Sequence, residues 1–269
     1  MIDLTSLDRV RAARPLVHCV SNIVSANDCA NLALAVGASP VMAHAPEEMA
    51  DITAASAATV LNTGTPDSAR FETCRLCGVE AARLGRPVAL DPVGIGASPW
   101  RLAHVQALLD AFTPSILRVN AGEAQALCQC RGGTEQGVDS PAPAAPEARR
   151  DAALALARRH RTAVLISGPE DLISDGETVW IVRGGSGRMA DITGAGCMLS
   201  VLCGVFAAVE PEPLKAALLA AVFWKACARQ AEQLAGQRGP GSFRAALLDT
   251  AGTLTAAALS PAANFEKLQ

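Results

Sequence analysis

Short runs of β-branched and other apolar residues alternate along the chain with longer, alanine-rich runs of helical periodicity. The apolar runs predict strands and the alanine-rich runs predict helices. The predicted strands are 16–20, 40–43, 59–61, 87–90, 115–119, 162–166, 172–174 and 178–182. The predicted helices are 26–36, 47–55, 68–84, 100–112, 121–128, 147–160, 196–209, 213–234 and 243–259. This alternation is typical of a mostly parallel sheet with helices on both faces, so we predict one α/β domain over residues 1–269 with about eight or nine strands.

Two segments depart from this alternation. The Asp175-Gly176 step separates two short strand runs and predicts a β-hairpin, which would make the sheet mixed. Residues 131–146 read RGGTEQGVDSPAPAAP, which is rich in Gly and Pro and poor in large apolar side chains. We predict a long mobile loop or lid there rather than a domain boundary, because the strand and helix pattern resumes after it.

The composition favours a folded, soluble domain. Of the 269 residues, 50% are apolar and 18% charged, which is enough for a large core. The formal net charge is −3, and the chain has six Phe, three Trp and no Tyr, which argues against nucleic-acid binding. Neither uncharged stretch, 29–46 or 192–209, has the roughly 20 predominantly apolar residues of a membrane span, and the N-terminus does not resemble a secretory signal. We therefore expect a cytoplasmic protein without a membrane partner.

The nine cysteines form only two close pairs, Cys74 with Cys77 and Cys128 with Cys130. A structural zinc site needs two such pairs, or nearby histidines, at tight spacing, and the four histidines are scattered. We therefore interpret the cysteines as reduced thiols, most of them buried as small apolar side chains.

The segment Asp191-Ile-Thr-Gly-Ala-Gly-Cys197 precedes a long apolar run. Gly194 and Gly196 allow a tight turn, so the N–H groups of residues 194–197 can converge at a helix N-terminus, a geometry that binds phosphate. The alternative is a glycine-rich turn in which Thr193 only caps the helix. The preceding acid, the nucleophilic side chain and the buried helix behind it favour the phosphate site.

Three further polar clusters follow predicted strands, which is where open α/β sheets bind ligands. Asp91 could hold Mg²⁺, or it could simply open an Asp-Pro turn. Asn120 and Glu123 could form a helix-capping box, or place an amide and a carboxylate beside a metal-bound phosphate, with the guanidinium of Arg118 nearby. Ser167 offers a hydroxyl beside a glycine that allows close backbone approach, unless the segment is a plain turn.

Segments 15–22 and 37–44 also place small polar groups or Met at strand ends. Asn22 closes the first segment, and Met42 lies in the second. Each segment contains a histidine, and His18 or His44 could act as a catalytic base. Either could instead be a structural histidine, which is the commoner role.

Six segments together resemble the hydroxyethylthiazole kinase family of the ribokinase-like superfamily. They are GASPVMAH (37–44), VLNTGT (60–65), LDPVGIGAS (90–98), RVNAGE (118–123), DITGAGC (191–197) and GPGSF (239–243). The first segment and the DPVGxGA pattern are specific to the family, whereas the GAG element with its helix is shared by the superfamily. The resemblance extends over residues 14–259 and implies a ribokinase-like fold.

The resemblance implies a kinase that transfers a phosphate from ATP, with Mg²⁺, to the hydroxyl of 4-methyl-5-(2-hydroxyethyl)thiazole, a step of thiamine salvage. By the same resemblance, Met42, Gly194 and Asn22 would contact the thiazole, while Arg118 and Ser167 would bind ATP. The family is trimeric with substrate pockets near the subunit contacts, so the resemblance also implies a homotrimer.

The remaining site residues are implied in the same way. Asp91 and Glu123 would organise Mg²⁺ and the phosphates. Cys197 takes the place at which most ribokinase-like enzymes have an Asp general base. A helix N-terminus lowers the pKa of a thiol and a neighbouring phosphate raises it, so we expect Cys197 to be only partly ionised and a poor base. The N–H cradle beside it would consist of the backbone at Gly194, Ala195 and Gly196.

The chain departs from the family pattern at two motifs. The family has His-Asn-x-Thr-Asn where this chain has HCVSN (18–22), and Arg-Gly-Asn-x-Ser-Glu where it has RVNAGE (118–123). Cys19 and Val119 change the fine contacts to substrate and nucleotide rather than the reaction. The rival interpretations are a kinase for another small alcohol, a hydrate dehydratase of the same fold and a non-catalytic sensor. Cys197 and the GASPVMAH segment count against the first two, and the retained Asp91 and Glu123 against the third.

Overall fold

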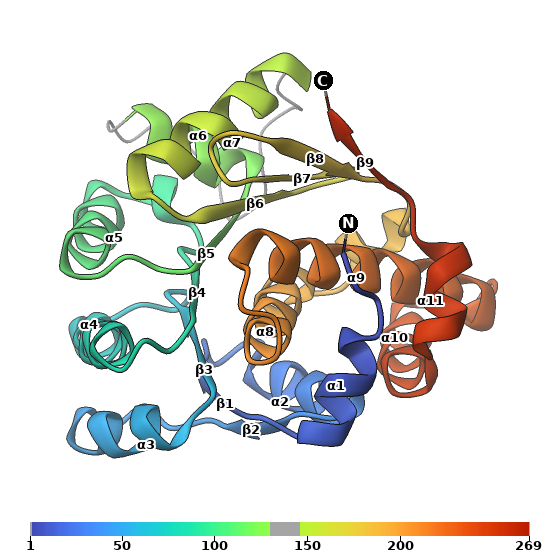
Figure 1. Cartoon of the computed structure of the whole chain (residues 1–269), viewed down its shortest axis with the longest axis horizontal. Coiled ribbons are helices and arrows are strands. Elements are labelled where there is room, and N and C mark those ends of the chain that lie inside the picture. Colours follow the sequence, from blue (N-terminus) through green and yellow to red (C-terminus); the bar gives the residue numbers. More distant parts are fainter. Residues whose placement is uncertain (1, 130–145, 269) are drawn as a thin grey trace.

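The computed structural model describes residues 2–129 and 146–268, which form one α/β domain around a nine-stranded sheet (Figure 1). The strand order is β2-β1-β3-β4-β5-β6-β7-β8-β9. Neighbouring strands from β2 to β6 pair in parallel, and those from β6 to β9 pair antiparallel. The strands are β1 Leu16–Val20, β2 Ser39–Val41, β3 Ala58–Asn62, β4 Val88–Asp91, β5 Ile116–Asn120, β6 Ala163–Ser167, β7 Asp171–Ser174, β8 Val179–Val182 and β9 Phe265–Leu268.

Helices cover both faces of the sheet, as Figure 1 shows. One face carries α3 Met49–Ala55, α4 Ser68–Arg83, α5 Pro99–Ala111, α6 Ala121–Gln129 and α7 Pro146–His160. The other carries α1 Ser6–Ala13, α2 Ala26–Val36, α8 Ala195–Ala207, α9 Pro213–Ala235, α10 Pro240–Thr253 and α11 Ala256–Ala262. Two separate clusters of buried apolar side chains, one on each side, form the core. The strands at the centre are therefore buried on both sides, which explains why β3 and β4 are buried at every position.

The predicted mixed sheet, every predicted strand and every predicted helix except the last are present, with ends that differ by a few residues. The single helix predicted at 243–259 is wrong, because the chain is extended at Leu254 and Thr255 between α10 and α11. The Thr255 hydroxyl accepts the N–H of Ala258 at 3.2 Å and so starts a new helix. The sequence patterns did not indicate α1 or β9.

The predicted loop at 131–146 falls almost entirely outside the described residues. Its last residue, Pro146, is instead the first residue of α7. Proline suits that position, because the first turn of a helix does not use its N–H groups. Cys74 and Cys77 are free and fully buried in α4, as predicted. In the described parts of the chain, no helix has both the length and the apolar character needed to cross a membrane.

The parallel strands bring polar residues to one edge of the sheet. Asn62, Asp91, Asn120 and Ser167 are the last residues of four adjacent strands, β3 to β6. Asn62 lies opposite Asp91 in the pairing register, and Asn120 lies opposite Ser167. Helix α8 packs so closely on β3 that a Cβ at Gly204 would be 2.3 Å from Val60. Ser200, in the first half of this helix, donates a hydrogen bond to Asp91 at 2.7 Å, so the helix N-terminus lies over this polar edge.

Candidate active site

The glycine-rich segment before α8 forms the start of that helix. Gly194 is the N-cap with a φ of 80°, a left-handed conformation that favours glycine. In the part of the chain that the structure describes, no side chain forms a capping hydrogen bond at this N-terminus, so Thr193 does not have the capping role that was the alternative. The first N–H groups of a helix have no partner within the helix. Residues 194–197 therefore lie at a helix N-terminus at the polar edge of the sheet, where the N–H cradle was predicted.

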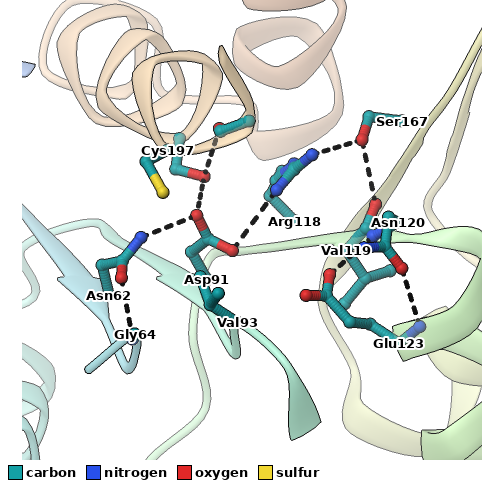
Figure 2. A network of polar contacts seen from close by, with 12 residues as sticks. Asn62, Gly64, Asp91, Val93, Arg118, Val119, Asn120, Glu123, Ser167 and Cys197 are labelled. Atoms are coloured by element: carbon teal, nitrogen blue, oxygen red, sulfur yellow. Dashed lines mark hydrogen bonds and ion pairs between the residues drawn. The ribbon is translucent and has the colours of Figure 1, made fainter. Parts of the chain in front are cut away.

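Asp91 is the centre of the polar network in Figure 2. Its side chain is fully buried. One oxygen, Oδ2, accepts hydrogen bonds from Asn62 Nδ2 at 2.9 Å and from Ser200 Oγ at 2.7 Å. The other, Oδ1, is 3.4 Å from Nη1 of Arg118. Burial raises the pKa of Asp91, and the nearby guanidinium and these hydrogen bonds oppose the rise.

The guanidinium of Arg118 lies between Asp91 and Ser167, whose hydroxyl accepts a hydrogen bond from Nη2 (Figure 2). It also presses against the first turn of α8, because a Cβ at Gly196 would be 2.5 Å from Nη2. The Nε of Arg118 is buried and has no hydrogen-bond partner among residues 2–129 and 146–268. The predicted ATP residues Arg118 and Ser167 are therefore in direct contact, and the guanidinium lies against the N–H cradle.

Glu123 and Asn120 form the helix-capping box that was one of the two interpretations of these residues. Its Oε2 accepts the N–H of Asn120 at 2.8 Å, and the N–H of Glu123 donates to Asn120 Oδ1 at 2.8 Å. Its other oxygen, Oε1, accepts the N–H of Gly94 at 2.9 Å and so fixes the loop after Asp91. Burial raises the pKa of Glu123 to about 7, although Arg118 acts to lower it. The carboxylate therefore joins the ends of two strands, β4 and β5.

Cys197 faces two asparagines at the ends of β1 and β3. Asn22 Nδ2 lies 3.3 Å from the sulfur of Cys197 and 3.0 Å from Asn62 Oδ1. The pKa of Cys197 is raised, first by burial and then by the charge of Asp91, while Ser25, Arg118 and Asn62 act to lower it. The direction of this pKa shift favours the neutral thiol, whereas the sequence led us to expect partial ionisation.

The other predicted residues, Met42, His18 and His44, have different surroundings. Met42 follows β2 and is half-buried against the core cluster that contains α8. His18 is fully buried in β1, its Nε2 is 3.0 Å from the carbonyl of Ala43, and burial lowers its pKa. His44 is exposed. The arrangement of His18 is that of a structural histidine rather than a base.

Three polar residues that build the site were not predicted from the sequence. Asn62 lies in the VLNTGT segment and at a strand end, which are both signals that could have indicated it. Ser200 is one helical turn after Gly196, so it was detectable only as a polar residue in an apolar helix. Ser25 packs on Gly194, since a Cβ there would be 2.8 Å from the Cβ of Ser25, and only the fold shows this contact.

Comparison with known proteins assigns the chain to a family. The sequence pattern of the hydroxyethylthiazole kinase family matches residues 7–257. The chain belongs to this family. It is 44% identical over 247 residues to the hydroxyethylthiazole kinase of Nitratidesulfovibrio vulgaris (strain DP4), covering 91% of this chain and 90% of the relative. It is 42% identical over 264 residues to that of Desulforudis audaxviator, covering 98% and 95%.

Solved structures agree with this assignment. The hydroxyethylthiazole kinase protein of Pyrococcus horikoshii OT3 superposes with a TM-score of 0.90 at 35% identity, over 99% of this chain and 98% of that one. Pyridoxal kinase of Staphylococcus aureus superposes with a TM-score of 0.62 at 15% identity, over 80% and 87%. At that identity the second likeness shows the ribokinase-like fold alone. The predicted fold class is confirmed.

Proposed function

We propose that this member of the hydroxyethylthiazole kinase family transfers the γ-phosphate of ATP to the hydroxyl of 4-methyl-5-(2-hydroxyethyl)thiazole, a step of thiamine salvage. The observation that carries the proposal is the N–H cradle of α8 beside a buried guanidinium and Cys197. Phosphoryl transfer requires mainly positioning and positive charge around the moving phosphate, and this arrangement offers both. The family assignment and the names of its relatives support the substrate.

We assign the acceptor and the nucleotide to the two sides of the cradle. Asn22, Met42 and Gly194 bind the thiazole on the side of β1 and β2, where apolar Met suits a small neutral heterocycle. Arg118 and Ser167 bind ATP on the side of β5 and β6. Arg118 supplies charge-assisted hydrogen bonds to phosphate oxygens. Its unpaired, buried Nε is one donor that a phosphate would satisfy.

Asp91 and Glu123 would organise Mg²⁺. Both carboxylates are hydrogen-bonded by the protein, but each retains lone pairs, since a carboxylate can accept about four hydrogen bonds. No group of three or more His, Cys, Asp or Glu side chains suited to a metal occurs among the described residues. That fits Mg²⁺, which usually binds one or two carboxylates, several waters and the phosphates of the substrate. When bound, the ion would neutralise charge on the phosphates.

Cys197 takes the position of the general base in this proposal. Its neutral thiol is a weak base, but a loose transition state needs little deprotonation of the attacking alcohol. The N–H groups of Gly194, Ala195 and Gly196 would stabilise the transferred phosphate. Catalysis then rests more on this cradle and on Arg118 than on proton removal.

We further propose a homotrimer in the cytoplasm, as the family resemblance implies, with no nucleic-acid or membrane partner. Ile23 and Val24 directly follow Asn22 and are 78% and 57% exposed, which is high for apolar side chains. A second copy of the chain that covered them would lie beside the acceptor side of the site. The negative net charge agrees with the lack of a nucleic-acid partner.

A coupled ADP-release assay tests the proposed reaction. We expect ADP and a phosphorylated thiazole only when ATP, Mg²⁺ and the thiazole alcohol are all present. Pyridoxal is the comparison acceptor, because pyridoxal kinases share the fold. Faster turnover of pyridoxal than of the thiazole alcohol would overturn the substrate assignment. Undiminished product formation in excess EDTA would overturn the metal assignment.

A further inference from the structure

A lysine of α9 holds the turn that follows β6. The Nζ of Lys225 donates hydrogen bonds to the carbonyls of Gly168 at 2.6 Å and Pro169 at 2.9 Å. It also forms an ion pair with Asp171 Oδ1 at 3.2 Å, and this oxygen accepts the N–H of Gly168 at 2.9 Å. One ammonium group therefore contacts three residues, Gly168, Pro169 and Asp171, in the segment that leads from β6 into β7.

This turn begins at the residue that contacts Arg118. Ser167 is the last residue of β6, directly before Gly168. Its hydroxyl accepts a hydrogen bond from the guanidinium of Arg118 and lies 3.4 Å from the carbonyl of Val119. A shift of the turn would therefore move the hydroxyl of Ser167 and, with it, the guanidinium.

Lys225 also balances a buried charge. Asp171 is 2% exposed, and burial raises its pKa while Lys225 and Arg118 act to lower it. Asp171 thus interacts with Arg118 as well as with Lys225. If Lys225 were absent, Asp171 would be a buried carboxylate that still interacts with Arg118, the residue assigned to ATP. The lysine leaves the guanidinium of Arg118 available to phosphate.

The path of the lysine side chain is confined by the segment after β8. Gly185 has a φ of 85°, and a Cβ there would be 2.8 Å from Cδ of Lys225. The side chain is only 14% exposed. Its ammonium is therefore held in one position, which reduces the entropy lost when the three contacts form.

We infer that Lys225 is a positioning residue for the nucleotide: it fixes the Gly168–Asp171 turn and neutralises Asp171, so that Ser167 and Arg118 meet ATP in one arrangement. The inference rests on the proposed function, in which Arg118 and Ser167 bind ATP. It adds a residue from α9, far in sequence from every motif of the site. Lys225 itself acts through these neighbours.

The first test is Lys225→Met, which keeps much of the apolar stem and removes the charge. We expect the Kd for ATP, measured by calorimetry without acceptor, to rise about tenfold, the lower end for a charge-assisted contact. The Kd for the thiazole alcohol should change less than twofold. The matched control is Lys215→Met on the same helix, where Lys215 forms only a surface pair with Glu212 at 2.7 Å. A purely structural role would lower the melting temperature without this selective loss.

A double variant tests the charge argument. Lys225→Met with Asp171→Asn removes both members of the pair, so residue 171 no longer competes for Arg118, and we expect ATP affinity to recover about threefold relative to the single variant. It should stay below that of the wild type, because the turn still lacks the two carbonyl contacts of Lys225. An unchanged ATP Kd in folded Lys225→Met overturns the inference, as does a double variant no better than the single one. If the single variant does not fold, the double variant with an ATP Kd equal to that of the wild type overturns it.

The same measurements separate this inference from the proposed function. A wild-type protein that binds ATP but does not phosphorylate the thiazole alcohol refutes the proposed reaction alone. The loss of ATP affinity in Lys225→Met would still support the positioning role. A wild-type protein that binds no ATP refutes both.

Discussion

The thiol of Cys197 lies at the first turn of a helix and is nevertheless held neutral. The positive end of the α8 dipole favours a thiolate. Burial and the carboxylate of Asp91 favour the neutral thiol, and the pKa is raised. Asn22 Nδ2 is 3.3 Å from the sulfur and orients it whichever form is present. Proton removal by this residue is therefore a small part of catalysis.

We expect Cys197→Ala to lower kcat by about 10- to 100-fold and to leave clear activity, since the N–H cradle and Arg118 remain. Cys197→Asp should stay active, and its kcat can exceed that of the wild type, because a carboxylate is ionised at neutral pH. Single-turnover rates at saturating ATP measure both effects. An inactive Cys197→Asp that is folded and still binds ATP would show that this position does not serve as the base.

At the scale of the elements, the first turn of α8 packs directly on the side chain of Arg118 in β5. Gly196 leaves room for the guanidinium of Arg118, which a Cβ would approach to 2.5 Å. The sequence indicated both residues, because Gly-rich helix starts and strand ends have local signals. It could not show that they touch, since the two segments are more than 70 residues apart and only the sheet order brings them together.

Gly196→Ala should therefore weaken ATP binding, as a partial loss of the contacts of Arg118 would. The added methyl displaces the guanidinium, so we expect the KM for ATP to rise about 10-fold or more, with a smaller change in the KM for the thiazole alcohol. Gly241→Ala is the matched control. Gly241 is also the second residue of a helix, α10, and a Cβ there meets nothing within 4 Å. Equal kinetics of the two variants would contradict the packing argument.

The element boundaries show where local pattern was sufficient. The left-handed Gly37 ends α2 where the sequence predicted, because glycine adopts a φ of 107° without strain. The break between α10 and α11 was missed, although Thr255 is a good N-cap. The apolar residues of the two helices keep the same helical spacing across the break, so the pattern predicted a single helix. β9 was missed because its four residues are stabilised by pairing with β8 rather than by their own pattern.

For the whole molecule, the parallel sheet concentrates acidic groups at one buried edge. Asp91, Glu123 and Asp171 are each at most 2% exposed, and burial raises the pKa of all three. Alternating strands and helices made this edge predictable as a ligand site. Composition could not reveal the clustering, because a net charge of −3 says nothing about where the charges lie. The fold thus buries carboxylates, at a cost in free energy, where Mg²⁺ and Arg118 would neutralise their charge.

This arrangement makes the stability of the ligand-free protein depend on pH through Glu123. Its folded-state pKa of about 7 exceeds the ordinary value of 4.5, so between these pH values the folded state binds a proton that the unfolded state releases. The contribution of Glu123 to the free energy of unfolding is therefore greatest below pH 4.5 and is lost as the pH rises through 7. Between pH 5 and pH 7 the loss should be about 1 to 3 kcal/mol, since one pKa unit corresponds to about 1.4 kcal/mol.

Glu123→Gln removes this titration, so the stability of the wild type minus that of the variant should fall as the pH rises from 5 to 7. Urea unfolding of both proteins at each pH measures it, and other titrating groups cancel in the difference. Glu80→Gln is the control, because Glu80 pairs with Arg83 at the surface and its pKa is lowered. We expect the variant to be less stable at every pH, since the amide nitrogen of Gln cannot accept one of the two backbone N–H groups that Glu123 accepts. A difference that stays constant or rises with pH would show that Glu123 is ionised in the folded protein, with Arg118 outweighing burial.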